Sequence, residues 1–264
     1  MRRVSAGPTV VAARYERVIV ASVARIWENV VDWEHLPWLH RTSFAAVRPF
    51  EERPDGWRAW VTTLPREDRS LVEVVVDRPR LRYVTRTVEG AGEGTEIRTA
   101  LEPVGERETR VHVEFRIPAV DAARAAKIGA AYVRLYERLW DEDEGMMVVR
   151  QRRLDRGGRR GANRAAIALG PVDDLRRRLP LVARLGDDEV RLVEVDGDIF
   201  AHGTVCPHLG GPLEAAPVVD GCVTCPWHGY RYDVRSGRCA DHDELTLPIA
   251  GVTVDANGNT TLSR

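Results

Sequence analysis

Four residues in the last third of the chain have the types and spacing of metal ligands. Cys206 and His208 are separated by one residue, and Cys225 and His228 by two, within the segments CPHLGG and CPWHGY. Glycine and proline surround each pair, which is typical of turns that direct side chains and backbone amides to one point. Thiolates are soft ligands suited to iron and sulfide, and imidazoles are neutral, so two of each indicate two different irons.

These segments closely resemble the Rieske [2Fe-2S] motif. The resemblance continues through VRLVEVDGDIFAHGTVCPHLGGPL and CPWHGYRYDVRSGRC, and implies a small Rieske ferredoxin domain from about residue 170 to the end. It places the two cysteines on the inner iron and the two histidines on the outer iron. The alternative is a zinc site in which Cys222 joins Cys206, Cys225 and His208, which leaves His228 without a role.

A second set of candidate ligands stands earlier, as D-x-x-H-x-x-x-x-H from Asp32 through His35 to His40. Asp32 and His35, three residues apart, share one face of a helix. His35 and His40 would diverge by about 140° on a regular helix. Convergence on one ion therefore requires the irregularity that Pro37 provides. The alternative is that both histidines are ordinary polar residues at a helix end.

A long helix is predicted at residues 121–153, and it offers a carboxylate. Its apolar stripe comprises Ile128, Tyr132, Leu135, Leu139 and Met146. At about 100° per residue, Asp143 falls roughly 40° from the direction of this stripe and Glu142 about 60° on its other side. A buried charge is costly unless it is paired or bound to metal. Asp143 is the predicted third ligand and Glu142 the next candidate, whereas Asp141 and Glu144 point away.

Two histidines and one carboxylate form the facial triad of non-haem Fe(II) oxygenases. NVVDWEHLPWLH resembles the iron-binding helix of Rieske non-haem iron oxygenases, and WDEDEGMMVVRQRR resembles their late, carboxylate-bearing helix. Carried over by position, the resemblance implies His35, His40 and Asp143 as Fe(II) ligands. It also implies that Asp32 bridges an iron histidine to His228 for electron transfer. In that family the Rieske domain usually comes first, so whether this bridge lies within one chain or between two stays open.

The elements that position these residues follow a recognisable order. Strands are predicted at 15–21, 57–64, 71–77, 81–88, 95–102 and 107–117, with a first helix at 23–36 and the long helix after the last strand. This order resembles the helix-grip fold of the START and Bet v 1-like (SRPBCC) superfamily, which encloses an apolar pocket. We therefore expect an α+β helix-grip catalytic domain at 1–153, an Arg/Gly-rich linker at 154–170 and an all-β Rieske domain at 171–264.

Composition limits the partners and the cellular compartment that we expect. The 264 residues carry a formal net charge of −1, which gives no reason to expect a nucleic acid or a membrane as partner. Four cysteines, two of them assigned to a cluster, are too few for a disulfide framework, and a reducing cytoplasm fits best. No apolar run approaches the roughly 18 residues of a membrane span, and no signal peptide is recognisable.

The leading hypothesis is a Rieske-type terminal oxygenase. Its [2Fe-2S] cluster would pass electrons to Fe(II), which activates O2 to oxidise an apolar small molecule. Without a flavin or dinucleotide motif, the electrons should come from a separate ferredoxin or reductase. Family resemblance implies a homo-oligomer, a trimer. The alternatives are a non-catalytic electron-transfer or ligand-binding protein without mononuclear iron, and a redox-sensing regulator.

Overall fold

The computed structural model describes residues 7–156 and 166–264. The chain divides into two compact units, and the boundary falls between Gln151 and Arg152. The first unit contains one sheet and the second contains two, and each unit has its own hydrophobic core. The two units are described separately below.

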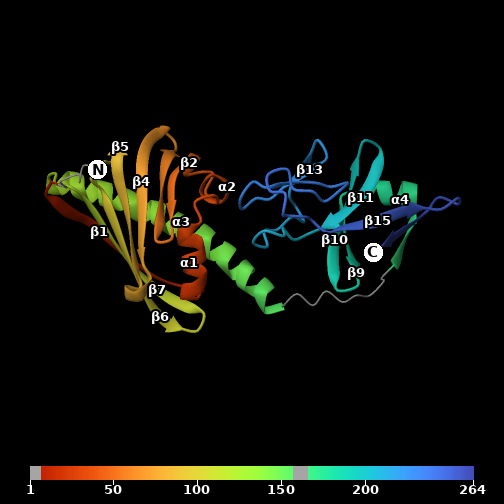
Figure 1. Cartoon of the computed structure of the whole chain (residues 1–264), viewed down its shortest axis with the longest axis horizontal. Helices are drawn as coiled ribbons and strands as arrows, with labels where there is room; N and C mark the ends of the chain where they lie inside the picture. Colours follow the sequence, from red (N-terminus) through yellow and green to blue (C-terminus); the bar gives the residue numbers. More distant parts are fainter. Residues whose placement is uncertain (1–6, 157–165) are drawn as a thin grey trace. The chain divides into compact units, whose positions relative to one another are not determined.

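The first unit is built on a seven-stranded antiparallel sheet (Figure 1). The strands lie in the order β1-β7-β6-β5-β4-β3-β2, so consecutive strands from β2 to β7 are neighbours and β1 joins at the β7 edge. Their bounds are β1 Thr9–Ile19, β2 Phe44–Arg53, β3 Gly56–Thr63, β4 Asp68–Asp77, β5 Arg82–Gly90, β6 Glu96–Gly105 and β7 Glu108–Pro118, with the 3-10 helix η1 at Arg78–Arg80.

Two short helices connect β1 to β2. Helix α1 (Val23–Val31) begins after Ser22, whose hydroxyl accepts the amide of Arg25, as expected for an N-cap residue. It ends at Asp32, so the helix predicted at residues 23–36 is shorter than expected. The side chain of Asp32 accepts a hydrogen bond from the backbone amide of Glu34 at 3.0 Å. This bond stabilises a turn, so the chain does not continue as a helix. Helix α2 (Leu36–Leu39) follows.

Helix α3 (Ala122–Arg156) lies across one face of the sheet (Figure 1). Its inward stripe packs on the sheet, where the ring of Tyr132 stacks on Phe115 at 5.3 Å and Tyr136 meets Phe115 edge-on. A Cβ at Gly129 would lie 2.2 Å from the carbonyl oxygen of Ala12, so glycine allows the helix to touch β1. A curved sheet that grips one long helix is the expected helix-grip fold.

The second unit consists mainly of short strands. A six-stranded sheet has the order β8-β16-β15-β11-β10-β9, and a three-stranded sheet has the order β12-β13-β14. The core formed by the six-stranded sheet and helix α4 includes Leu175, Leu185, Leu192 and Leu262. The bounds are β8 Ala166–Pro171, α4 Val172–Arg176, β9 Leu181–Leu185, β10 Asp188–Val195, β11 Asp198–Gly203, β12 Val218–Val219, β13 Cys222–Thr224, β14 Arg231–Asp233, β15 Ile249–Val254 and β16 Asn259–Ser263.

The structure differs from the predicted elements at three places. The first strand is Thr9–Ile19 and not 15–21, and the edge strand β2 was not predicted. The expected linker at 154–170 overlaps α3 at its start and β8 at its end, so the second unit begins its sheet before residue 171. The central part of that linker, residues 157–165, lies outside the described residues.

Within the described ranges, no helix combines the length and the apolar content that crossing a membrane requires. This holds for α3 as well, although it is 35 residues long, because charged residues recur along it.

Candidate metal centres

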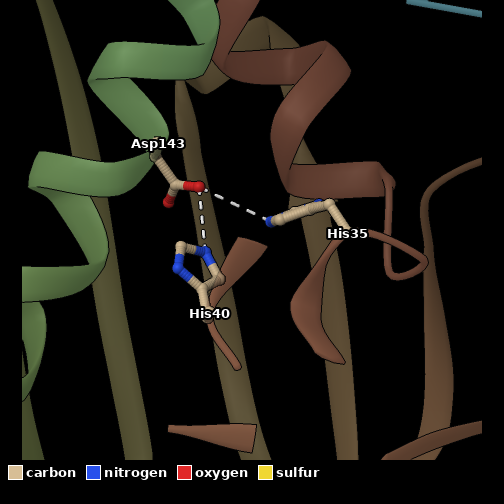
Figure 2. A group of neighbouring side chains, drawn as sticks. All are labelled: His35, His40 and Asp143. Carbon is tan, nitrogen blue, oxygen red and sulfur yellow. Dashed lines mark ion pairs between the residues drawn. The ribbon is translucent and has the colours of Figure 1, made fainter. Parts of the chain in front are cut away.

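His35, His40 and Asp143 come together inside the first unit. Each offers one ligand atom, and these atoms lie within 4.8 Å of one another. Oδ1 of Asp143 lies 3.5 Å from Nε2 of His35 and 3.0 Å from Nε2 of His40, as Figure 2 shows. Across residues 7–156 and 166–264, no other three acidic, histidine or cysteine side chains lie close enough to share one ion.

Helix α2 positions both histidines. His35 immediately precedes this short helix, His40 immediately follows it, and Pro37 occupies its first turn. The two imidazole rings lie 5.2 Å apart between centroids, with their planes at 70°. Two residues five positions apart therefore converge, which one continuous helix would not allow.

Asp143 projects from the buried stripe of α3, where Trp140 and Met147 are also buried. The side-chain amide of Asn29, on α1, donates to Oδ1 of Asp143 at 3.0 Å. Burial by itself would favour the neutral acid, but the contacts with the two histidines outweigh it and lower the pKa of Asp143. A charged carboxylate is thus held inside apolar surroundings.

Further carboxylates lie behind both imidazole rings. Nδ1 of His35 lies 3.6 Å from Asp32, and Nδ1 of His40 lies 2.6 Å from Glu142. Burial opposes the charged form of His35, but its partners Asp143 and Asp32 outweigh burial and raise the pKa of His35 to about 10. Each ring has one nitrogen toward Asp143 and the other toward a second acid.

The acids of the DEDE run on α3 have different surroundings. Asp143 is the one whose oxygen lies in the group with the histidines, whereas Glu142 contacts only the far side of the His40 ring. Asp141 and Glu144 both accept hydrogen bonds from Arg17 on β1, away from the group. The geometry therefore separates the two candidate acids, with Asp143 at the meeting point.

The donor set suits a divalent transition-metal ion. Two imidazole nitrogens and one carboxylate oxygen are ligands that iron and similar metals take, and the three side chains are buried. A buried carboxylate needs a compensating charge. His35, whose pKa is raised, supplies it as a bound proton, and a cation at the same place would displace that proton.

Two tyrosines line the interior near the carboxylate. Burial raises the pKa of Tyr83 and of Tyr136 above the ordinary value for a phenol, and the negative charge of Asp143 adds to both shifts. Tyr83 also packs edge-on against Trp27, with ring centroids 6.2 Å apart. The surroundings of the group are therefore aromatic, with neutral hydroxyl groups.

In the second unit, the four predicted cluster ligands lie on two similar loops. In the first loop, the amide of Cys206 donates to Gly211 at 2.9 Å and the amide of Gly210 donates back to Cys206 at 3.0 Å. In the second loop, the amide of Cys225 donates to Tyr230 at 2.8 Å. Gly210 adopts the left-handed conformation, with φ of +87°. Each loop is thus a closed turn with its cysteine buried.

The two loops bring their ligands to one side. The rings of His208 and His228 lie 4.6 Å apart between centroids, and Tyr230 packs against both. Hydrogen bonding by the Cys225 thiol lowers the pKa of Cys206 to about 6. Four ligands on two facing loops, with a stabilised thiolate, fit a cluster larger than one ion.

The zinc alternative does not fit this arrangement. It requires Cys222 to meet Cys206, Cys225 and His208 at one ion, and no such group occurs in the described parts of the chain. In β13, Cys222 alternates with the buried Val223, which pairs with Tyr232. The side chain of Cys222 therefore lies on the face of β13 opposite to that of Val223.

Three contributing residues were not predicted from the sequence. Asn29 lies three residues after the buried Ile26, on the buried face of α1, and a polar residue on that face is the signal that could have identified it. Glu142 was considered only as a ligand and not as a partner of His40. The hydroxyl of Tyr232 lies 3.2 Å from Sγ of Cys206. Its position in the sequence, seven residues after Cys225, does not indicate this contact. The bridge from Asp32 to His228 stays a prediction.

Comparison with known proteins places residues 165–249 in the Rieske [2Fe-2S] domain family. The chain is 37% identical to mouse apoptosis-inducing factor 3 over 74 residues, which is 28% of this chain and 12% of that protein. It is 31% identical over 83 residues to the anthranilate 1,2-dioxygenase ferredoxin subunit of Burkholderia cepacia, covering 31% of this chain and 74% of the subunit.

Among solved structures, a START superfamily protein from Mycobacterium smegmatis covers 53% of this chain and 96% of its own, with 18% identity and a TM-score of 0.42. The chain spans only 12% of the length of apoptosis-inducing factor 3. It spans 74% of the dioxygenase ferredoxin subunit, and residues 165–249, which match the family, contain both ligand loops. By its second unit, the chain belongs to the Rieske [2Fe-2S] family.

Proposed function

We propose that this protein is a Rieske-type terminal oxygenase, in which the second unit carries a [2Fe-2S] cluster and the first holds a non-haem Fe(II). Its substrate would be an apolar small molecule, oxidised with O2 by hydroxylation or a related reaction. The finding that carries the proposal is the buried group of His35, His40 and Asp143.

This group has the composition that the proposed chemistry needs. Fe(II) bound by two histidines and one carboxylate supplies O2 activation, because such a site keeps coordination positions open. The chain's own residues hold the ligand atoms in place: Asn29 donates to Asp143, and Asp32 lies behind His35. Buried charged groups with shifted pKa values cluster at functional sites, which supports a functional role for this group.

The interior around the group supports an apolar substrate. Trp27, Trp57, Tyr83 and Trp140 are buried in the same hydrophobic cluster. Such side chains exclude water and offer flat apolar surfaces to a ligand. An apolar compound, such as an aromatic or terpenoid molecule, is the substrate class that we propose for these surroundings.

The remaining parts of the proposal concern partners and setting. Electrons would come from a separate ferredoxin or reductase, and Asp32 would connect the first unit to His228 of a second unit, in the same or another chain. A trimer is the proposed assembly by resemblance to Rieske oxygenases. A reducing cytoplasm is the proposed compartment because Cys206 and Cys225 are assigned to the cluster and the other two cysteines, Cys222 and Cys239, form no disulfide.

The proposal is tested with the full chain, chemically reduced and exposed to isotopically labelled O2 with a panel of apolar aromatic and terpenoid compounds. We expect labelled oxygen in a product with the unmodified chain and none with Asp143→Ala, at equal cluster content. Reoxidation of the cluster without labelled product, in a chain that takes up no Fe(II), would instead indicate the electron-transfer alternative.

A further inference from the structure

We propose that Glu142 is a positioning residue of the mononuclear iron site, which acts through His40 and does not touch the metal itself. This inference rests on the proposed function, because it concerns the same three ligands. It assigns a role to Glu142, which is not one of the three proposed ligands.

The geometry around His40 carries the inference. Consecutive residues on a helix project about 100° apart, and here Glu142 and Asp143 reach the two opposite nitrogens of one imidazole. Oε2 of Glu142 lies 2.6 Å from Nδ1, and Oδ1 of Asp143 lies 3.0 Å from Nε2. One turn of α3 therefore holds the His40 ring from both sides.

This contact fixes which nitrogen of His40 can bind a metal. An ionised carboxylate can only accept a hydrogen bond, so Nδ1 must carry the proton that Glu142 accepts. The lone pair of Nε2 then points toward Asp143 and His35, where the ion would be held. A carboxylate that accepts a hydrogen bond from a histidine ligand also makes the imidazole more basic, so it binds a metal more strongly.

Burial strengthens the effect. The side chain of His40 is 1% exposed, so water cannot replace Glu142 as the partner of Nδ1, whereas the side chain of Glu142 is 28% exposed. The corresponding contact of the other histidine, from His35 to Asp32, is longer, at 3.6 Å. Glu142 is therefore the residue that orients His40.

The same helix offers a matched control. Asp141 precedes Glu142 in the sequence and carries the same charge, but it bonds to Arg17 at the surface. Asp141→Asn and Glu142→Gln each remove one negative charge from this turn of α3. Only Glu142→Gln alters the partner of His40, so a difference between them cannot come from net charge alone.

The experiment measures metal affinity in the full chain with its cluster in place. Fe(II) binding is followed anaerobically by competition with a chelator, and Co(II) is used to record the visible absorption spectrum of the site at saturation. Glu142→Gln and Glu142→Ala should weaken affinity by about 10- to 100-fold, the effect typical of losing such a partner. The loss should be smaller for Gln, which keeps an acceptor oxygen.

The outcomes separate this inference from the proposed function. Weaker Fe(II) binding and an altered Co(II) spectrum in both Glu142 variants, with Asp141→Asn unchanged, support the positioning role. Equal affinity and spectrum in Glu142→Gln and the unmodified chain overturn that role but leave the iron site standing. If the unmodified chain binds neither ion in the first unit, both proposals fall. Should Glu142→Ala not fold, Glu142→Gln decides.

Discussion

Oδ1 of Asp143 lies 3.0 Å from Nε2 of His40, which joins α3, the late helix of the first unit, to the end of the short helix α2. Both residues are buried. The contact exists because His40 follows directly after the short helix α2, and because Asp143 falls on the buried stripe of α3. Two polar side chains from distant parts of the sequence thus share one small polar site in an apolar interior.

Removing a histidine from this site should remove one metal ion and leave the cluster intact. We expect His40→Ala to lose the mononuclear iron and all O2-dependent product formation, because a site with two ligands binds Fe(II) weakly. Iron analysis and the visible spectrum of the cluster measure the two effects separately.

The matched control is His112→Ala. His112 is an exposed histidine on β7 that contacts Glu16 and Glu102, away from the buried group. Its replacement should leave iron content and turnover unchanged. Retention of full iron by His40→Ala would show that His40 is not a ligand.

Tyr232 should set the reduction potential of the cluster. Its hydroxyl lies 3.2 Å from Sγ of Cys206, and a cysteine bound to iron as thiolate can only accept that hydrogen bond. The bond favours the more negative, reduced cluster. A hydrogen bond worth about 1 kcal/mol corresponds to roughly 40 mV for a one-electron couple.

The Tyr232→Phe variant should therefore have a more negative potential by about that amount, measured by spectroscopically monitored redox titration. Tyr83→Phe, in the first unit, serves as the control and should leave the potential unchanged. An unchanged or more positive potential in Tyr232→Phe would mean that the hydroxyl does not donate to the cluster.

Gly211 should be required for cluster assembly. A Cβ at this position would lie 2.5 Å from Sγ of Cys225, closer than any real contact of this kind. We expect Gly211→Ala to lower cluster content sharply, as read from sulfide analysis and the visible spectrum. Gly203→Ala, where the nearest atom would be 3.5 Å away, should keep its cluster. Equal loading of both variants would contradict the described loop geometry.

Much of this architecture was predictable from the sequence because its signals are local. Residue type, short spacing and the surrounding motif identify Cys206, His208, Cys225 and His228, and Pro37 indicates an irregular segment near His35 and His40. The strand β2 was missed because FAAVRPFEER contains a proline and several charges. It is an edge strand, where proline is tolerated.

Other features depend on contacts that no local pattern encodes. Asn29 bonds to Asp143, which is 114 positions away, and Glu142 contacts His40 across 102 positions. Periodicity on α3 indicated the buried direction, and so indicated Asp143. It could not indicate which nitrogen of which ring each acid would meet, because that depends on how α2 docks against α3.

The buried His202 should make stability depend on pH. Burial, together with the charge of Arg191 on the paired strand, lowers the pKa of His202. The unfolded chain then binds a proton more readily than the folded chain below the ordinary histidine value of about 6.5. Stability is complete above that pH and falls as the pH decreases toward the lowered pKa.

We expect His202→Gln to flatten this dependence relative to the unmodified chain, in denaturant titrations from neutral to mildly acidic pH. Arg191 remains in place in this variant, held by hydrogen bonds to the backbone of Leu213 and Ala216. An unchanged slope in His202→Gln would assign the pH dependence to other groups.

The most direct test of the account is the iron and sulfide content of the full chain, reconstituted anaerobically and freed of loosely bound metal. A Rieske cluster contributes two irons and two sulfides, so a chain that also holds Fe(II) in its first unit should contain about three irons for about two sulfides. We predict that ratio for the unmodified chain, and about two of each for Asp143→Ala. Equal iron and sulfide in the unmodified chain would contradict the mononuclear site and the oxygenase with it.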